Sequence, residues 1–331
     1  MIRALQLTLG LVISAVCVWL SMKDMRIAEV WAALRQANYM GFVGVCMVTL
    51  FGFWLRAIRW RLLIRSPQRI STDSLFSATM IGFMANNVLP FRLGEFIRPW
   101  ALSRREKLSK SMLLATVVVE RAIDMLTLLA ILAISMLIHP VTESTEAGRL
   151  VQGGAKLLLA ACLLLTVFVV VAERNRPLAM RLIGLLPERL NTRVAKLADR
   201  FLDGFSLFRD FGRMLKVFLL SFVMFLCFAV ALTISMWSLS ITVPWYAGLL
   251  MLVVTAIGIM VPAAPGYVGT LNIACVAGLA LFDVGKAQSV PFGWFYFFSQ
   301  WLPITAVGLF YLNREGLSLR SLGQAQESGA A

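Results

Sequence analysis

The sequence has few charged residues, a single histidine and few cysteines, and each shortage excludes a class of protein. Asp, Glu, Lys and Arg make up 15% of the 331 residues, against about 25% in an ordinary soluble domain. The one histidine, His139, has no cluster of carboxylates beside it, so we expect neither a metal nor a cofactor. The five cysteines form no C-x-x-C pair, which favours small buried apolar side chains over a redox or zinc site.

Motifs for nucleotide binding and for catalysis are missing as well. The pattern G-x-x-x-x-G-K-[ST] does not occur, so any uphill transport needs an ion gradient or consumption of its product. We find no paired nucleophile and base, and we expect no soluble catalytic domain. These absences favour a transporter over an enzyme, while leaving catalysis open.

Apolar residues are abundant and stand in runs long enough to cross a membrane. They make up 60% of the sequence, and the mean hydropathy is +0.82. A helix needs about 20 residues to cross roughly 30 Å of hydrocarbon. No small-residue cleavage site follows the first run, so we expect it to be an uncleaved span. We predict six full spans, at residues 5–22, 40–63, 112–138, 157–172, 218–239 and 292–312.

The positive charges lie beside these runs and predict the topology. The net charge is +14, yet the loops at 139–150 and 240–246 hold one basic residue or none. Basic loops stay in the cytoplasm, so we expect both termini on the cytoplasmic face of the inner or plasma membrane. This placement favours anionic lipid headgroups as partners and argues against nucleic acid.

Two further apolar regions are interrupted, and we predict that each is a re-entrant helical hairpin. The region 75–101 starts and ends beside basic segments, so it cannot be a single crossing. The region 247–283 is broken at residues 262–269 and starts and ends on the outer side. The order span–hairpin–span then occurs twice in opposite orientation, an inverted repeat typical of transporters. The alternative is that Pro262 and Pro265 kink one ordinary span.

These patterns together predict an all-α, polytopic membrane protein. We expect one transmembrane domain over residues 1–320 and a disordered cytoplasmic tail over 321–331. Within the cytoplasmic segment 174–213, apolar residues recur at helical spacing and most basic residues lie off that stripe. This is typical of an amphipathic helix, lying either on the inner leaflet or on the protein's own cytoplasmic face.

Charged residues at membrane depth mark the candidate site. Each costs at least roughly 2.5–3.5 kcal/mol on insertion scales, so it persists where it is paired or lines a polar path. Glu120 and Asp124 share one helix face and need a cation between them, which Arg92 or Arg98 can supply. A substrate site and an internal ion-pair network that pins the hairpin are both open interpretations. The candidates are Asn87, Arg92, Glu95, Arg98, Glu120, Arg121 and Asp124.

A separate basic group ends the span at 40–63. Arg56, Arg59 and Trp60 match the basic and aromatic residues that anchor helix ends at the cytoplasmic interface. We expect such an anchor, and the alternative is a rim that binds lipid headgroups.

Four motifs in this order resemble the lysylphosphatidylglycerol synthase transmembrane family, also called flippase-like. The resemblance implies a stand-alone membrane domain that moves lipids between leaflets, without the aminoacyl-transfer domain of the bifunctional enzymes. It also adds the Pro/Gly break to the candidate site. The motifs are Arg56-x-x-Arg59-Trp60, Asn87-x-x-Pro90-x-Arg92-x-Gly94-Glu95-x-x-Arg98, Glu120-Arg121-x-x-Asp124 and Pro262-x-x-Pro265-Gly266-x-x-Gly269.

Two positions depart from the family pattern. Tyr267 replaces the second glycine of Pro-Gly-Gly-x-Gly, and Asn272 stands where a glutamate is usual. The missing carboxylate disfavours a lysyl-lipid, whose headgroup is cationic, and favours a lipid that bears a phosphate or a sugar.

The sequence therefore predicts a translocase for an anionic or glycosylated lipid, such as a phospholipid, a polyprenyl-linked sugar or a hopanoid-type lipid. Arg92 and Arg98 would hold the phosphate, while Glu95, Glu120 and Asp124 gate the path or exchange protons. The two breaks are expected to meet near the midplane. The alternatives are a non-catalytic partner of a glycosyltransferase or envelope-lipid pathway and, less favoured, a membrane-embedded transferase. Homo-oligomerisation also stays open.

Overall fold

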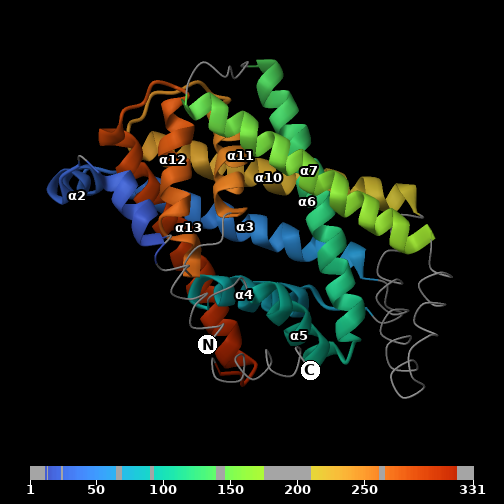
Figure 1. The fold of residues 1–331 in the computed structure, drawn as a ribbon. Helices are drawn as coiled ribbons and strands as arrows, with labels where there is room; N and C mark the ends of the chain where they lie inside the picture. The colour runs from blue at the N-terminus through green and yellow to red at the C-terminus, as the bar shows by residue number, and fades with distance from the viewer. Residues whose placement is uncertain are drawn as a thin grey trace.

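The structure is a computed structural model, and it describes residues 12, 14–23, 25–64, 69–89, 93–138, 146–174, 210–260 and 265–318. Every regular element within these ranges is a helix, which confirms the predicted all-α class (Figure 1). The amphipathic segment predicted at 174–213 falls almost wholly outside the described residues, and the tail at 321–331 falls entirely outside them.

Four helices in the described part of the chain are long and apolar enough to cross a membrane. They coincide with four of the six predicted spans, so the chain is a multi-pass membrane protein. These helices are α3 (Tyr39–Leu63), α6 (Lys110–Ile138), α10 (Phe211–Ser238) and α13 (Lys286–Arg314).

The other two predicted spans are less complete. A further long helix, α7 (Glu146–Arg174), covers the predicted span at 157–172 without counting among the four. The span at 5–22 is helical over 14–22, apart from which only residue 12 is described. A short helix, α2 (Ile27–Arg35), follows and was not predicted, because nine residues are too few for a hydropathy signal.

The first interrupted region forms two helices, α4 (Thr72–Val88) and α5 (Gly94–Glu106). Arg105 near the end of α5 pairs with Asp73 near the start of α4, so the two helices run antiparallel. Their backbones touch at Gly82 and Gly94, because a Cβ atom on Gly94 would overlap the Gly82 carbonyl oxygen. The Asn86 side chain accepts a hydrogen bond from the Gly94 N–H at 2.8 Å and joins the two sides of the break.

The second interrupted region also forms two helices, α11 (Ala247–Met260) and α12 (Thr270–Ala280), joined through the short 3₁₀ helix η2 (Pro265–Tyr267). Gly266 and Gly269 have φ values of 74° and 91°, in the left-handed region that favours glycine. The backbone therefore turns sharply here, and a simple proline kink in one continuous helix does not describe it.

The two interrupted regions lie against opposite halves of α13. Gly293, in the first half of α13, packs against Asn272 of α12. In the second half of α13, Thr305 accepts a hydrogen bond from the Asn87 side chain of α4 at 3.1 Å. Figure 1 accordingly shows α11 and α12 toward one end of the bundle and α4 and α5 toward the other.

The breaks of the two regions are nonetheless in contact. A Cβ atom on Gly266 of η2 would lie 3.4 Å from the carbonyl oxygen of Asn87 at the end of α4. The helices around this contact are held by apolar packing, in which Phe53 of α3 meets Phe83 of α4 and Phe228 of α10 edge to face at 4.7 and 5.8 Å. The packing of the long helices thereby positions the two breaks against each other.

Candidate functional site

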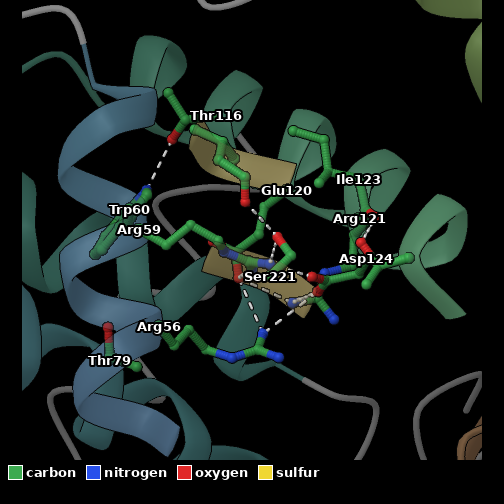
Figure 2. Close-up of polar contacts among 12 residues, drawn as sticks. Arg56, Arg59, Trp60, Thr79, Thr116, Glu120, Arg121, Ile123, Asp124 and Ser221 are labelled. Atoms are coloured by element: carbon green, nitrogen blue, oxygen red, sulfur yellow. Dashed lines mark hydrogen bonds and ion pairs between the residues drawn. The ribbon is translucent and has the colours of Figure 1, made fainter. Parts of the chain in front are cut away.

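A cluster of charged side chains from three helices is buried inside the protein (Figure 2). We call it the arginine cluster. Helix α3 contributes two of its arginines, α5 contributes a third, and α6 contributes a fourth together with both carboxylates. Its members are Arg56, Arg59, Arg98, Glu120, Arg121 and Asp124.

Glu120 lies at the centre of the arginine cluster and is fully buried. One of its carboxylate oxygens, Oε1, accepts hydrogen bonds from Arg56 and Arg98 at 2.9 Å each. The guanidinium groups of Arg59 and Arg121 lie 3.0 and 3.1 Å from the same oxygen. Four positive groups converge on this carboxylate, which stabilises its negative charge.

Asp124, one helical turn further along α6, receives the same kind of contact. Arg59 donates to its Oδ1 at 2.5 Å, and Arg121 and Arg56 lie 3.2 and 3.5 Å from its Oδ2. The second hydrogen bond of Arg59 goes to the Ser221 hydroxyl of α10, at 2.7 Å. The cluster therefore connects α6, α3 and α10 at one level.

Two aromatic rings make cation–π contacts with arginines of the cluster. The guanidinium carbon of Arg98 lies 3.8 Å from the ring centre of Trp60, and that of Arg56 lies 5.0 Å from the ring centre of Phe83. The Trp60 indole N–H donates to Thr116 of α6 at 2.9 Å, which fixes the ring. Such cation–π contacts stabilise desolvated arginines.

The depth of the arginine cluster follows from the positions of its members along their helices. Glu120 comes ten residues after the start of α6 at Lys110, roughly 15 Å at 1.5 Å per residue. Arg59 comes four residues before the end of α3 at Leu63, roughly 6 Å by the same rise. Asp124 is the middle residue of α6, so the cluster joins the middle of α6 to the last turns of α3.

Positive charge is in excess in the arginine cluster. Four guanidinium groups face two carboxylates, a surplus of two positive charges among these six buried or mostly buried groups. Among the described residues, several buried guanidinium nitrogens also have no hydrogen-bond partner. They are Arg56 Nε, Arg59 Nε, Arg98 Nε, Arg98 Nη2 and Arg121 Nε, while Arg59 Nη2 has only its ion-pair contact with Glu120 at 3.0 Å. A site with this balance attracts an anion and repels a metal ion.

The expected exposed anchor of Arg56, Arg59 and Trp60 at the interface is wrong, whereas their binding of a lipid headgroup stays a prediction. Their exposed fractions are 5%, 0% and 0%, and all three face α6. The count of basic residues cannot reveal that α6 supplies two carboxylates at the same level, which draw these arginines inward.

The remaining predicted site residues are not part of the arginine cluster. Glu95 lies at its edge, 3.7 Å from Arg121. Asn87 bonds to α13, away from the charges. At the second break, where Pro265 begins η2, Gly266 approaches Asn87 and Trp301, and Gly269 approaches the helix at 14–22. Arg92 and Pro262 lie outside the described residues.

A second polar network was missed entirely. Asp73 of α4 pairs with Arg105 of α5 at 2.8 Å and with Arg314 of α13 at 3.1 Å, while Tyr311 donates to it at 3.1 Å. Arg105 also pairs with Glu315, at 2.7 Å. The network fastens the ends of α4 and α5 to the end of α13. Its members are far apart in the sequence, so no local pattern could have found it.

Comparison with known proteins places this geometry in a family. Neither the curated proteins nor the solved structures give a match. Residues 7–308 match the family described as the lysylphosphatidylglycerol synthase TM region. This match covers all four motifs and the whole arginine cluster. The chain therefore belongs to the lysylphosphatidylglycerol synthase TM region family, whose members are membrane proteins connected with lipid synthesis.

Proposed function

We propose that this protein is a lipid translocase whose arginine cluster binds the phosphate of an anionic or glycosylated lipid. The observation that carries the proposal is the charge surplus in a buried site with unpartnered guanidinium nitrogens. Burying uncompensated charge is costly, so an anion that enters the site gains more than it would from a balanced ion-pair network. Phosphate oxygens match the planar guanidinium donors.

The proposal also needs a path for the headgroup. Arg121 is the most exposed arginine of the cluster, with 33% of its side chain accessible, and Glu95 beside it is 29% accessible. Both adjoin the break between α4 and α5, so the headgroup enters from this side. The acyl chains stay in the lipid, because only the polar part gains from leaving it.

Movement across the membrane is assigned to the two interrupted regions. In this proposal α4–α5 and α11–α12 are re-entrant hairpins that enter from opposite sides. Their contact between Asn87 and Gly266 supports a shared gate, and their positions on opposite halves of α13 support opposite directions of entry. The hairpins open alternately around the site, as broken helices do in inverted-repeat transporters.

A non-catalytic role in a lipid pathway is the second candidate. It is favoured by the dense pairing of Glu120, since a carboxylate with four guanidinium partners also suits a network that only pins α5 to α3 and α6. A membrane-embedded transferase is less favoured, because arginines already contact both carboxylate oxygens of Glu120, the candidate base.

Reconstituted vesicles test the proposal. Fluorescent phosphatidylglycerol or a labelled polyprenyl phosphate is placed in both leaflets, and a membrane-impermeant reductant is added outside. Wild-type protein should let the reductant reach more label than in empty vesicles, and Arg121→Gln should slow this by roughly tenfold, as for a lost charge-assisted contact. Arg35→Gln, an exposed arginine on α2, is the matched control. If no lipid moves faster than in empty vesicles, the translocase proposal is wrong and the non-catalytic role gains.

A further inference from the structure

Glu95 lies at the edge of the arginine cluster, and its contact with Arg121 is the longest ion pair that the cluster makes. Arg121 Nη1 lies 3.7 Å from Glu95 Oε1, whereas Arg121 Nη2 lies 3.1 and 3.2 Å from Glu120 and Asp124. A separation of 3.7 Å is beyond hydrogen-bonding distance, so Glu95 acts on Arg121 by charge alone. Glu95 is also the least buried carboxylate near the cluster. It is therefore the negative group most easily displaced.

Glu95 differs from the other two carboxylates in the helix that carries it. Glu120 and Asp124 belong to α6, a 29-residue helix that spans the bilayer by length and composition. Glu95 is the second residue of α5, which begins directly after the break between α4 and α5. Glu95 therefore lies in the first turn of α5, whereas the two carboxylates of α6 lie in the middle of a long helix.

Glu95 changes the net charge of the site. Without Glu95 the cluster holds a surplus of two positive charges, and with it the surplus falls to one. In a site of low dielectric constant each uncompensated charge is expensive. A carboxylate that approaches Arg121 when the site is empty, and withdraws when a phosphate binds, keeps the cluster partly neutralised in both states.

We infer that Glu95 is an internal substitute for the lipid phosphate, which competes with the headgroup for Arg121 and so promotes its release. The inference rests on the proposed function, because it assumes that the headgroup binds in the arginine cluster. Glu95 contacts no substrate in this scheme and acts through Arg121, which makes it a positioning residue. A carrier needs such a competitor, since a headgroup held by several arginines would otherwise leave slowly.

The test compares binding with turnover in Glu95→Gln, which keeps the shape of the side chain and removes its charge. Purified protein in neutral detergent is titrated with short-chain phosphatidylglycerol, and with glycerol phosphate to separate a lipid from a free phosphate ester. Calorimetry should show Kd falling by roughly tenfold in Glu95→Gln, because the competing charge is gone. In vesicles, Glu95→Gln should reach its half-maximal translocation rate at a lower lipid concentration than wild type. Its maximal rate should also be lower, because the headgroup is released more slowly. Short-chain phosphatidylcholine, whose net charge is zero, should bind weakly to all forms.

Two further variants serve as a control and as a test of the charge of Glu95. Glu106→Gln, at the other end of the same helix, should leave both Kd and rate unchanged. Glu95→Asp keeps the charge on a shorter side chain and should fall between wild type and Glu95→Gln. If wild type binds the anionic probes and Glu95→Gln binds them with the same Kd, the competitor role is wrong while the proposed function stands. If neither form binds any anionic probe, the proposed function fails and the inference fails with it.

Discussion

A single nitrogen of Arg98, Nη1, lies 2.9 Å from both carboxylate oxygens of Glu120, and this contact ties α5 to α6. Removing the charge of Glu120 takes away the one carboxylate that all four guanidinium groups of the cluster contact. Glu120→Gln should therefore lower the free energy of unfolding by about 3–5 kcal/mol, the usual cost of breaking a buried ion pair. Thermal unfolding in detergent measures this, with the exposed Glu29→Gln as control.

The double variant Arg98→Gln/Glu120→Gln refines that measurement. If the two groups act mainly on each other, the double variant should be less destabilised than the sum of the single variants. Additive losses would show that the other three arginines dominate the stabilisation of Glu120.

Gly94 should be one of the least replaceable residues in the chain. A Cβ atom there meets the Gly82 carbonyl oxygen in the backbone of α4 as well as the Asn86 side chain, and since the backbone oxygen cannot rotate away, the helices must separate. We expect Gly94→Ala to destabilise the protein by at least about 1–3 kcal/mol, as overpacking does. Gly153→Ala on α7 is the matched control, because nothing lies within 4 Å of an added Cβ there. Equal melting temperatures for the two variants would contradict the close contact of α4 and α5.

The contact between the two breaks predicts a crosslink. Cysteines at Asn87 and Val268, in a background without the five native cysteines, should be joined by a short bismaleimide. Lipid movement in vesicles should stop when the crosslink forms, because the two hairpins can no longer separate. Mass spectrometry measures the crosslink and the reductant assay measures the movement. Full movement in crosslinked protein would argue against alternate opening at this place.

The distribution of basic residues predicts which helix ends face the cytoplasm. Lys110 begins α6 and Ala287 lies in the first turn of α13, and both are exposed. In intact cells, a membrane-impermeant thiol reagent should label Ala287→Cys from outside and should spare Lys110→Cys. The reverse pattern would overturn the predicted orientation and, with it, the direction in which each hairpin enters.

The Asp73 network should respond to acid. Burial raises the pKa of the Asp73 carboxyl, but hydrogen bonds from Arg105 and Tyr311 and the charge of Arg314 outweigh it and lower the pKa below its usual value. A lowered pKa means that the stabilisation is present at neutral pH and is lost as the pH falls below about 4. Wild type should therefore melt above Asp73→Asn at pH 7, and the difference should shrink in acid. A difference that does not change with pH would mean that the carboxylate charge is not what stabilises the network.

Hydropathy could predict the long helices, because their length and composition are set by the thickness of the bilayer. The same rule that charge at membrane depth needs partners identified Arg98, Glu120, Arg121 and Asp124. It also named Arg98 as a partner for Glu120, which the structure confirms, but it could not add Arg56 and Arg59, which lie on α3 more than 60 residues earlier in the chain. The contacts of the two breaks were likewise beyond prediction in detail, since they depend on how whole helices pack.

The expectation that Arg56 and Arg59 are exposed at the interface was wrong for a physical reason, and part of that reason can be read from the sequence. These two residues are three apart and share a face of α3, whereas Arg61 lies off that face and is exposed. Counting basic residues near a helix end treats all three alike. Their spacing separates the buried pair from the anchor, but only once a partner helix with carboxylates at the same level is known.

The order of the cluster along the chain bears on how the protein enters the membrane during synthesis. Arg56, Arg59 and Arg98 leave the ribosome before Glu120 and Asp124, so these three arginines are made before the carboxylates that pair with them. Helix α5 carries too many charges to insert alone, and α4 is short for a span. We therefore expect α3, α4 and α5 to stay in a polar environment until α6 is made, because unpaired charges at membrane depth are costly. Chains that stop before residue 120 should be recognised as unfinished and degraded.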